Sequence, residues 1–107
     1  MPAWLLLIGA VVMEVIGTTA LKLSDGLTRL VPTLVVIVGY GLAFTALAFV
    51  LKRIEMGVAY AVWAGLGTAL IALIGVIFFG ESLNPLKIGS LSLIIIGLIG
   101  LNLAGSY

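Results

Sequence analysis

The 107-residue chain has no cysteine, no histidine and very little charge. Without cysteine it can form neither disulfides nor cysteine metal sites, and without histidine the usual zinc and haem ligand sets are also missing. We therefore expect no metal and no cofactor. Only 8% of the residues are charged, whereas a soluble domain carries about a quarter. The net charge of +1 offers no argument for a nucleic-acid partner.

What the chain does have is hydrophobic sequence, which makes up 64% of its residues. The few charges separate four apolar runs at about 3–21, 32–51, 57–79 and 86–104. Each run is close to the ~20 residues that a helix needs to cross the hydrocarbon core, where the backbone must satisfy its own hydrogen bonds. The sequence therefore predicts an all-α integral membrane protein, with residues 1–107 as a single four-helix transmembrane domain. The first run is too long, and too polar at Glu14, to predict a signal peptide.

The connections between the runs are short and rich in turn residues. The first, "KLSDGLTRLVP", contains Ser24, Asp25 and Gly26, and Pro32 suits a helix start. The third, "GESLNP", places Asn84 as a predicted N-cap and Pro85 as the first helical residue. Loops this short predict antiparallel neighbouring helices.

Glu14 is the only charged residue between Pro2 and Leu21, and no Lys or Arg lies deep in the other three runs to pair with it. A charge at mid-membrane costs roughly 2.5–3.5 kcal/mol on insertion scales, so such acids usually have a function. Ala10, Gly17 and Thr18 share its helix face and are small, which leaves room beside the carboxylate. A carboxylate there can hold a proton or a cation, but not comfortably both, which predicts a site that exchanges the two. The alternative is a permanently neutralised structural acid.

Aromatic side chains supply the second half of the predicted site. Tyr60 and Trp63 are three residues apart and share a helix face, and Tyr40 lies at a comparable depth in the second run. Aromatic faces near a carboxylate recognise organic cations, which is worth ~2 kcal/mol when the contact is desolvated. The alternative for Trp63 is packing alone.

Small residues mark two further features. Gly65 and Gly67 predict either close helix packing or a kink between two open states. The fourth run carries a stripe of residues on one face, which we interpret as a dimer interface, with packing inside the protomer as the alternative. The predicted interface residues are Ser90, Leu93, Ile94 and Gly97.

The basic residues are almost balanced between the two sides of the membrane. The first and third loops hold Lys22, Arg29 and Lys87, and the second loop, on the opposite side, holds Lys52 and Arg53. Because Lys and Arg in short loops set orientation, a difference of one residue predicts that the chain inserts both ways up.

Three stretches resemble motifs of the small multidrug resistance family. "EVIGTTALK" resembles the segment around the family's membrane glutamate, "DGLTRLVPT" its first loop, and "GVAYAVWAGLG" its third-helix aromatic and glycine motif. The resemblance covers essentially the whole chain. It implies an antiparallel homodimer in the bacterial inner membrane that exports hydrophobic or quaternary ammonium cations in exchange for protons.

The resemblance also implies roles for individual residues. It assigns proton and cation binding to Glu14 and substrate contact to Tyr40, Tyr60 and Trp63. Thr18 becomes a neighbour of the site, and Gly65 and Gly67 become the kink. The guanidinium-exporting branch has a Trp after the glutamate, whereas this chain has Val15, Ile16 and Gly17, which favours the drug-exporting branch.

Two other functions stay open from the sequence. One is export of guanidinium or polyamines by the same fold, and the other is a structural membrane subunit without transport of its own. No nucleophile, base and orienting group occur together, so we expect no enzyme. The expected partners are small organic cations, protons, membrane lipid and a second copy of the chain.

Overall fold

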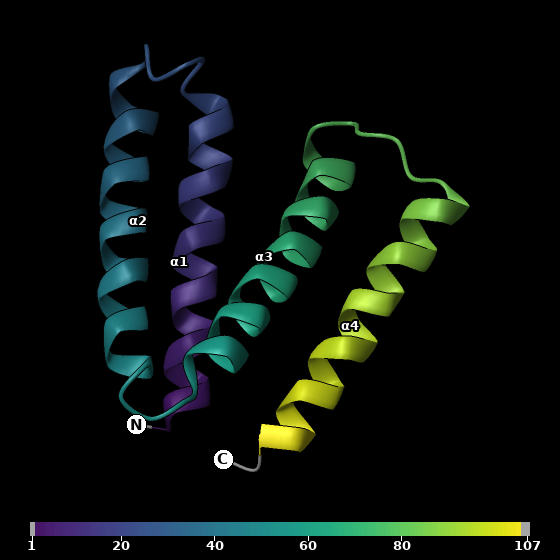
Figure 1. The fold of residues 1–107 in the computed structure, drawn as a ribbon. Helices are drawn as coiled ribbons and strands as arrows, with labels where there is room; N and C mark the ends of the chain where they lie inside the picture. Colours follow the sequence, from purple (N-terminus) through teal and green to yellow (C-terminus); the bar gives the residue numbers. More distant parts are fainter. Residues whose placement is uncertain (1, 106–107) are drawn as a thin grey trace. The chain divides into compact units, whose positions relative to one another are not determined.

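The computed structural model describes residues 2–105, and these form four α-helices (Figure 1). They are α1 (Ala3–Leu23), α2 (Leu30–Val50), α3 (Met56–Phe78) and α4 (Pro85–Gly105). All four are long and apolar enough to cross a membrane, and the described residues contain no strand. The prediction of an all-α chain with four spans is confirmed.

The helices form two compact units, one within Met1–Arg53 and the other within Ile54–Tyr107. In the first unit α1 packs against α2, and in the second α3 packs against α4. Each unit is an antiparallel helical hairpin, as the short loops predicted (Figure 1). The single four-helix domain stays a prediction, because each hairpin is compact by itself.

The helix bounds differ from the predicted runs by at most two residues. α1 continues through Lys22 to Leu23, because a basic residue in the last turn interacts favourably with the negative end of the helix dipole. α2 begins at Leu30, two residues before Pro32. The proline still lies in the first turn, where its missing N–H would have no helical partner. α4 begins at Pro85, and Asn84 Oδ1 accepts a hydrogen bond from Lys87 N at 2.9 Å, which confirms the predicted N-cap.

The turn between α1 and α2 is organised by the buried side chain of Ser24. Its hydroxyl donates to the Leu21 carbonyl at 2.6 Å and accepts from Leu27 N at 2.9 Å. Asp25, Gly26 and Leu27 all have positive φ, which is uncommon for a leucine. The Ser24 hydrogen bonds stabilise this unusual backbone and allow α2 to return along α1.

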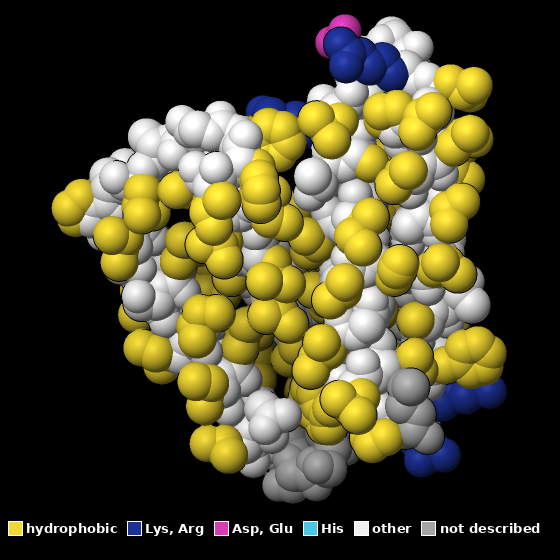
Figure 2. All heavy atoms as spheres, turned by 180° about the vertical axis from the view of Figure 1, so that it is seen from behind, with side chains coloured by type: hydrophobic (Ala, Val, Ile, Leu, Met, Phe, Trp, Pro, Cys, Tyr) yellow, Lys and Arg dark blue, Asp and Glu magenta, His cyan; other side chains and the backbone are white. Residues whose placement is uncertain are grey.

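Large apolar side chains are exposed along the helices, as expected where the solvent is lipid. Figure 2 shows hydrophobic side chains over the length of the helices on the visible face, with Lys and Arg gathered near helix ends. The fourth span is the extreme case, because none of the described side chains of α4 is buried.

Candidate functional site

The carboxyl group of Glu14 is the chemical centre of the first hairpin. Glu14 lies near the middle of α1 and is half-buried. Its Oε2 atom is buried and has no hydrogen-bond partner among the described residues. A buried acceptor without a partner is costly, so a proton or a bound cation at this oxygen would relieve that cost.

A hydrogen bond between two hydroxyl groups connects this region of α1 to α2. Thr18 lies one turn after Glu14, and its side chain interacts with the Glu14 carboxyl group. The Thr18 Oγ1 atom also lies 2.6 Å from the hydroxyl oxygen of Tyr40 on α2. Glu14, Thr18 and Tyr40 therefore form one polar cluster, and the structure brings together three of the residues selected from the sequence.

Two glycines allow the helices to approach closely beside this cluster. A Cβ atom at Gly17 would lie 2.8 Å from two ring carbons of Tyr40, so the tyrosine ring rests directly on the glycine. A Cβ atom at Gly39 would lie 3.0 Å from the Met13 carbonyl oxygen and 3.2 Å from Gly17 Cα. Sequence reasoning did not select Gly39 for the site. The nearby Gly41 has open space around it. The rotation of α2 about its axis therefore decides that Gly39, and not Gly41, faces α1.

Ala10, the remaining residue predicted on the α1 face, is buried one turn before Glu14. Its side chain is only a methyl group, so it leaves space on the helix face next to Glu14. A substrate role for Ala10 stays a prediction.

The aromatic residues predicted on α3 belong to the second unit and differ in exposure. Trp63 is 8% exposed, whereas Tyr60 is 64% exposed. A buried Trp63 agrees with both the packing and the substrate-contact interpretations. The joint use of Tyr60, Trp63 and Glu14 in one site therefore stays a prediction.

The glycines of α3 lie in a helix that is continuous from Met56 to Phe78. A Cβ atom at Gly65 would lie 2.8 Å from Leu98 Cδ2 and 3.2 Å from Ile94 Cγ2, so this glycine admits side chains of α4. Gly67 is buried. Close packing therefore accounts for Gly65 in this conformation, and the kink at Gly65 and Gly67 stays a prediction.

The stripe predicted as a dimer interface on α4 divides into two parts. Ile94 contacts α3 of the same chain at Gly65, and Ser90 lines a cavity between α3 and α4. Leu93 is 71% exposed, and Gly97 has open space around it. A role in dimer contacts is therefore simplest for Leu93 and Gly97, and for all four residues it stays a prediction.

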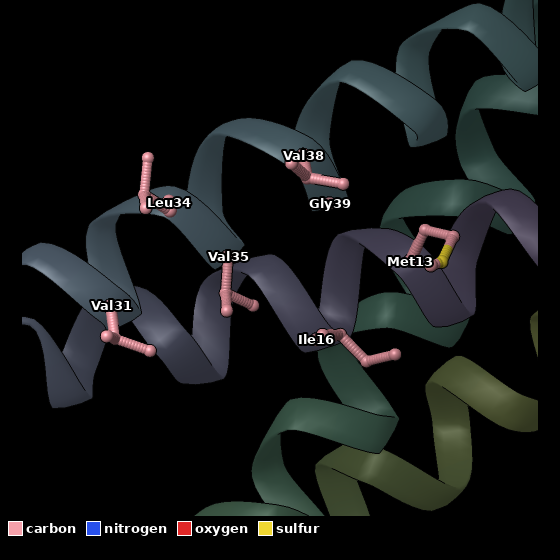
Figure 3. Close-up of a pocket in the computed structure, with 7 residues that line it drawn as sticks. All are labelled: Met13, Ile16, Val31, Leu34, Val35, Val38 and Gly39. Atoms are coloured by element: carbon pink, nitrogen blue, oxygen red, sulfur yellow. The ribbon is translucent and has the colours of Figure 1, made fainter.

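An apolar groove of about 380 Å³ lies on the first hairpin, beside the point where Gly39 of α2 packs against α1. Figure 3 shows Met13 and Ile16 of α1, with Val31, Leu34, Val35, Val38 and Gly39 of α2. These side chains carry no charged or hydrogen-bonding group, so the groove cannot neutralise a cation. In the first hairpin, cation binding is therefore expected at the cluster of Glu14, Thr18 and Tyr40 and not in this groove.

Among the described residues, no group of acidic residues could hold a metal ion.

Comparison with known proteins gives matches over nearly the whole chain. Residues 2–94 match the model of the family described as Small Multidrug Resistance protein. The quaternary ammonium compound-resistance protein QacE of Escherichia coli is 50% identical over 103 residues, which cover 96% of this chain and 94% of the relative.

Two further relatives extend the match. A putative ethidium bromide resistance protein of Escherichia coli is 50% identical, with 89% of this chain and 83% of the relative covered. The multidrug resistance protein mmr of Mycobacterium leprae is 45% identical, with 98% of this chain and 99% of the relative covered. This four-span chain therefore belongs to the small multidrug resistance family and is a multi-pass protein of the bacterial inner membrane.

Proposed function

We propose that this chain is a proton-coupled antiporter that exports hydrophobic, aromatic or quaternary ammonium cations. Membership of the small multidrug resistance family supports drug efflux as its function. The relatives are named for resistance to quaternary ammonium compounds and to ethidium, an aromatic cation. The observation that carries the proposal is the buried Oε2 atom of Glu14, which lies within a membrane span and has no hydrogen-bond partner in the described part of the chain.

Glu14 exchanges its two ligands because both need the same oxygen atoms. A protonated carboxyl group is neutral and has no charge with which to hold a cation. A deprotonated carboxylate in a site of low dielectric attracts a cation strongly. Proton binding from the outside therefore releases the drug, and proton loss to the inside prepares the site for the next drug molecule.

Two copies of Glu14, one from each protomer of an antiparallel homodimer, would supply enough energy for concentrative export. One pH unit is worth about 1.4 kcal/mol per proton, so two protons give ~2.7 kcal/mol, or roughly a hundredfold cation gradient. With a monovalent drug the cycle also moves one net charge, which adds ~2.3 kcal/mol per 100 mV. No covalent step is required.

The Thr18–Tyr40 hydrogen bond couples the protonation of Glu14 to the position of α2. Thr18 interacts both with the Glu14 carboxyl group and with Tyr40, so a change in the charge of Glu14 alters the hydrogen bonding of the Thr18 hydroxyl group and with it the contact between α1 and α2. Tyr40 also offers an aromatic ring to a bound cation. In this proposal Trp63 and Tyr60 provide further aromatic surface, and Gly65 and Gly67 allow α3 to bend between states.

Substrate-driven proton release from the purified protein tests the proposal directly. Addition of ethidium or a quaternary ammonium ion in weakly buffered detergent solution should release protons, and Glu14→Gln should abolish the release because the amide does not titrate. Glu55→Gln, which removes an acid outside the spans, is the matched control and should leave the release unchanged.

Other outcomes of the same experiment identify the alternatives. Release driven by guanidinium or a polyamine, but not by ethidium, would assign the chain to export of compact polar cations. Normal drug/proton exchange in liposomes by the Glu14→Gln variant would overturn the mechanism. A protein that releases no proton with any of these cations would be a structural subunit.

A further inference from the structure

The apolar groove of the first hairpin covers only half the depth of the membrane. Figure 3 shows Val31 at one end of the groove and Met13 at the other. Val31 lies in the first turn of α2, beside the first loop, whereas Met13 and Gly39 lie near the middle of their helices. Between Val31 and Gly39 the helix rises about 12 Å, close to half of the ~30 Å hydrocarbon core. The groove therefore runs through one leaflet of the bilayer.

The groove ends where the two helices touch. A Cβ atom at Gly39 would lie 3.0 Å from the Met13 carbonyl oxygen and 3.2 Å from Gly17 Cα, so the helices leave no passage at this depth. Ile16 lines the groove and is two residues from Glu14, so the two side chains point to nearly opposite sides of α1. The groove is therefore separate from the Glu14 site.

The walls of the groove are apolar, exposed and stiff. Ile16, Val31 and Val35 are all exposed, so molecules of the surrounding membrane can reach them. Each of these side chains is β-branched and has few rotamers, so the groove keeps its shape when empty. A hydrocarbon chain buries apolar surface there and needs no polar contact.

A basic residue is held at the end of the groove beside the first loop. Arg29 immediately precedes α2 and is two residues before Val31. Arg29 N donates to the Ser24 carbonyl at 3.1 Å, and the Arg29 carbonyl accepts from Thr33 N at 3.1 Å and from the Thr33 hydroxyl at 2.6 Å. These bonds fix the backbone, whereas the side chain is exposed. A guanidinium group at the membrane surface is well suited to bind phosphate oxygens in pairs.

We propose that the groove binds one acyl chain of a membrane phospholipid whose phosphate lies at Arg29. The chain enters beside Val31 and ends at Gly39. Depth and charge select this occupant. A helix of a second copy would extend along the whole hairpin, whereas the groove stops at mid-membrane. A transported cation needs a negative charge, which the groove does not offer.

Native mass spectrometry of the full chain with three added compounds tests the assignment. They are phosphatidylglycerol, diacylglycerol with the same acyl chains, and glycerophosphoglycerol, which has no acyl chain. We expect phosphatidylglycerol to be retained about tenfold more than diacylglycerol, because its phosphate adds charge-assisted hydrogen bonds. Glycerophosphoglycerol should not be retained, because it buries no apolar surface. Equal retention of the two lipids, or retention of glycerophosphoglycerol, would overturn the proposal.

Matched variants test the two ends of the groove separately. Val35→Phe should fill the groove and abolish retention, whereas Ile37→Phe, at an exposed position of α2 outside the groove, should not. Arg29→Gln should lower retention of phosphatidylglycerol to that of diacylglycerol. Lys22→Gln is its control, because Lys22 lies nine positions after Met13 and so on the opposite side of α1. Equal losses in the Arg29 and Lys22 variants would show unspecific attraction to basic residues and overturn the proposal.

A phospholipid with a photoreactive group at the end of its acyl chain locates the chain without any variant. The label should attach near Met13, Val38 or Gly39, and labelling only on α3 or α4 would overturn the proposal. Arg29 is exposed, so Arg29→Gln also decides the question where Val35→Phe prevents folding. Release of the bound lipid by ethidium would assign the groove to transported cations and refute the lipid site. None of these measurements depends on transport through Glu14.

Discussion

The close contact between Gly17 and the Tyr40 ring predicts that Gly17→Ala destabilises the protein. Alanine at position 17 would place its Cβ atom 2.8 Å from two ring carbons. Carbon atoms in contact are about 3.5 Å apart or more, so the ring must retreat by about 0.7 Å. A retreat of that size lengthens the 2.6 Å contact between Thr18 and Tyr40 beyond the usual range for two hydroxyl groups.

The expected loss of stability follows from three terms. Overpacking costs about 1–3 kcal/mol, the weakened hydrogen bond about 0.6 kcal/mol, and the better helix propensity of alanine returns about 1 kcal/mol. Gly17→Ala should therefore lower the free energy of unfolding by about 0.6–2.6 kcal/mol. The same variant should impair ethidium-driven proton release, because Thr18 loses its connection to α2.

Unfolding of the purified protein by sodium dodecyl sulfate in mixed micelles, followed by circular dichroism, measures the first effect. Gly9→Ala is the matched control on the same helix, because a Cβ atom there meets nothing within 4 Å. In a Tyr40→Ala background, the destabilisation by Gly17→Ala should disappear, since the ring it would meet is absent. Equal effects of the substitutions at positions 9 and 17 in both backgrounds would refute the reasoning.

Three further predictions concern the rest of the chain. Trp63→Ala should weaken binding of aromatic cations by about 1–2 kcal/mol in titrations, if the ring makes a desolvated cation contact. Gly97→Val should weaken dimerisation in detergent, measured by crosslinking and size analysis, because it fills open space on α4 that we assign to the partner. Reporter tags at the C-terminus of the unaltered chain should give signal on both sides of the membrane, since the basic residues of the loops are nearly balanced.

Each of these three predictions has a result that would contradict it. Unchanged cation affinity of a folded Trp63→Ala protein would leave Trp63 with a packing role. Gly57→Val, at another glycine with open space, is the control for Gly97→Val, and an unaltered dimer in both would place the interface elsewhere. A tag signal on one side only would refute dual insertion.

The sequence by itself determined the spans and the chemistry of the centre. A backbone in lipid must form its own hydrogen bonds, so an apolar run of the right length becomes a helix whatever its neighbours are. The helix ends also depend on local sequence, as the Asn84 cap and Pro85 show. The bounds shifted by at most two residues, and the two-residue shifts are the extension of α1 to Leu23 and the earlier start of α2 at Leu30. Glu14 was identified for the same reason, because its cost in the membrane depends on depth rather than on contacts.

Only the tertiary structure decided which small residues bring helices together. Gly17 and Thr18 meet Tyr40, and Gly39 rather than Gly41 lies at the crossing of α1 and α2. Similarly, Ile94 turns toward Gly65 while Gly97 remains open. Such contacts depend on the rotation and crossing of two helices, which no local pattern specifies, because a glycine looks the same in sequence whether it faces a helix or lipid.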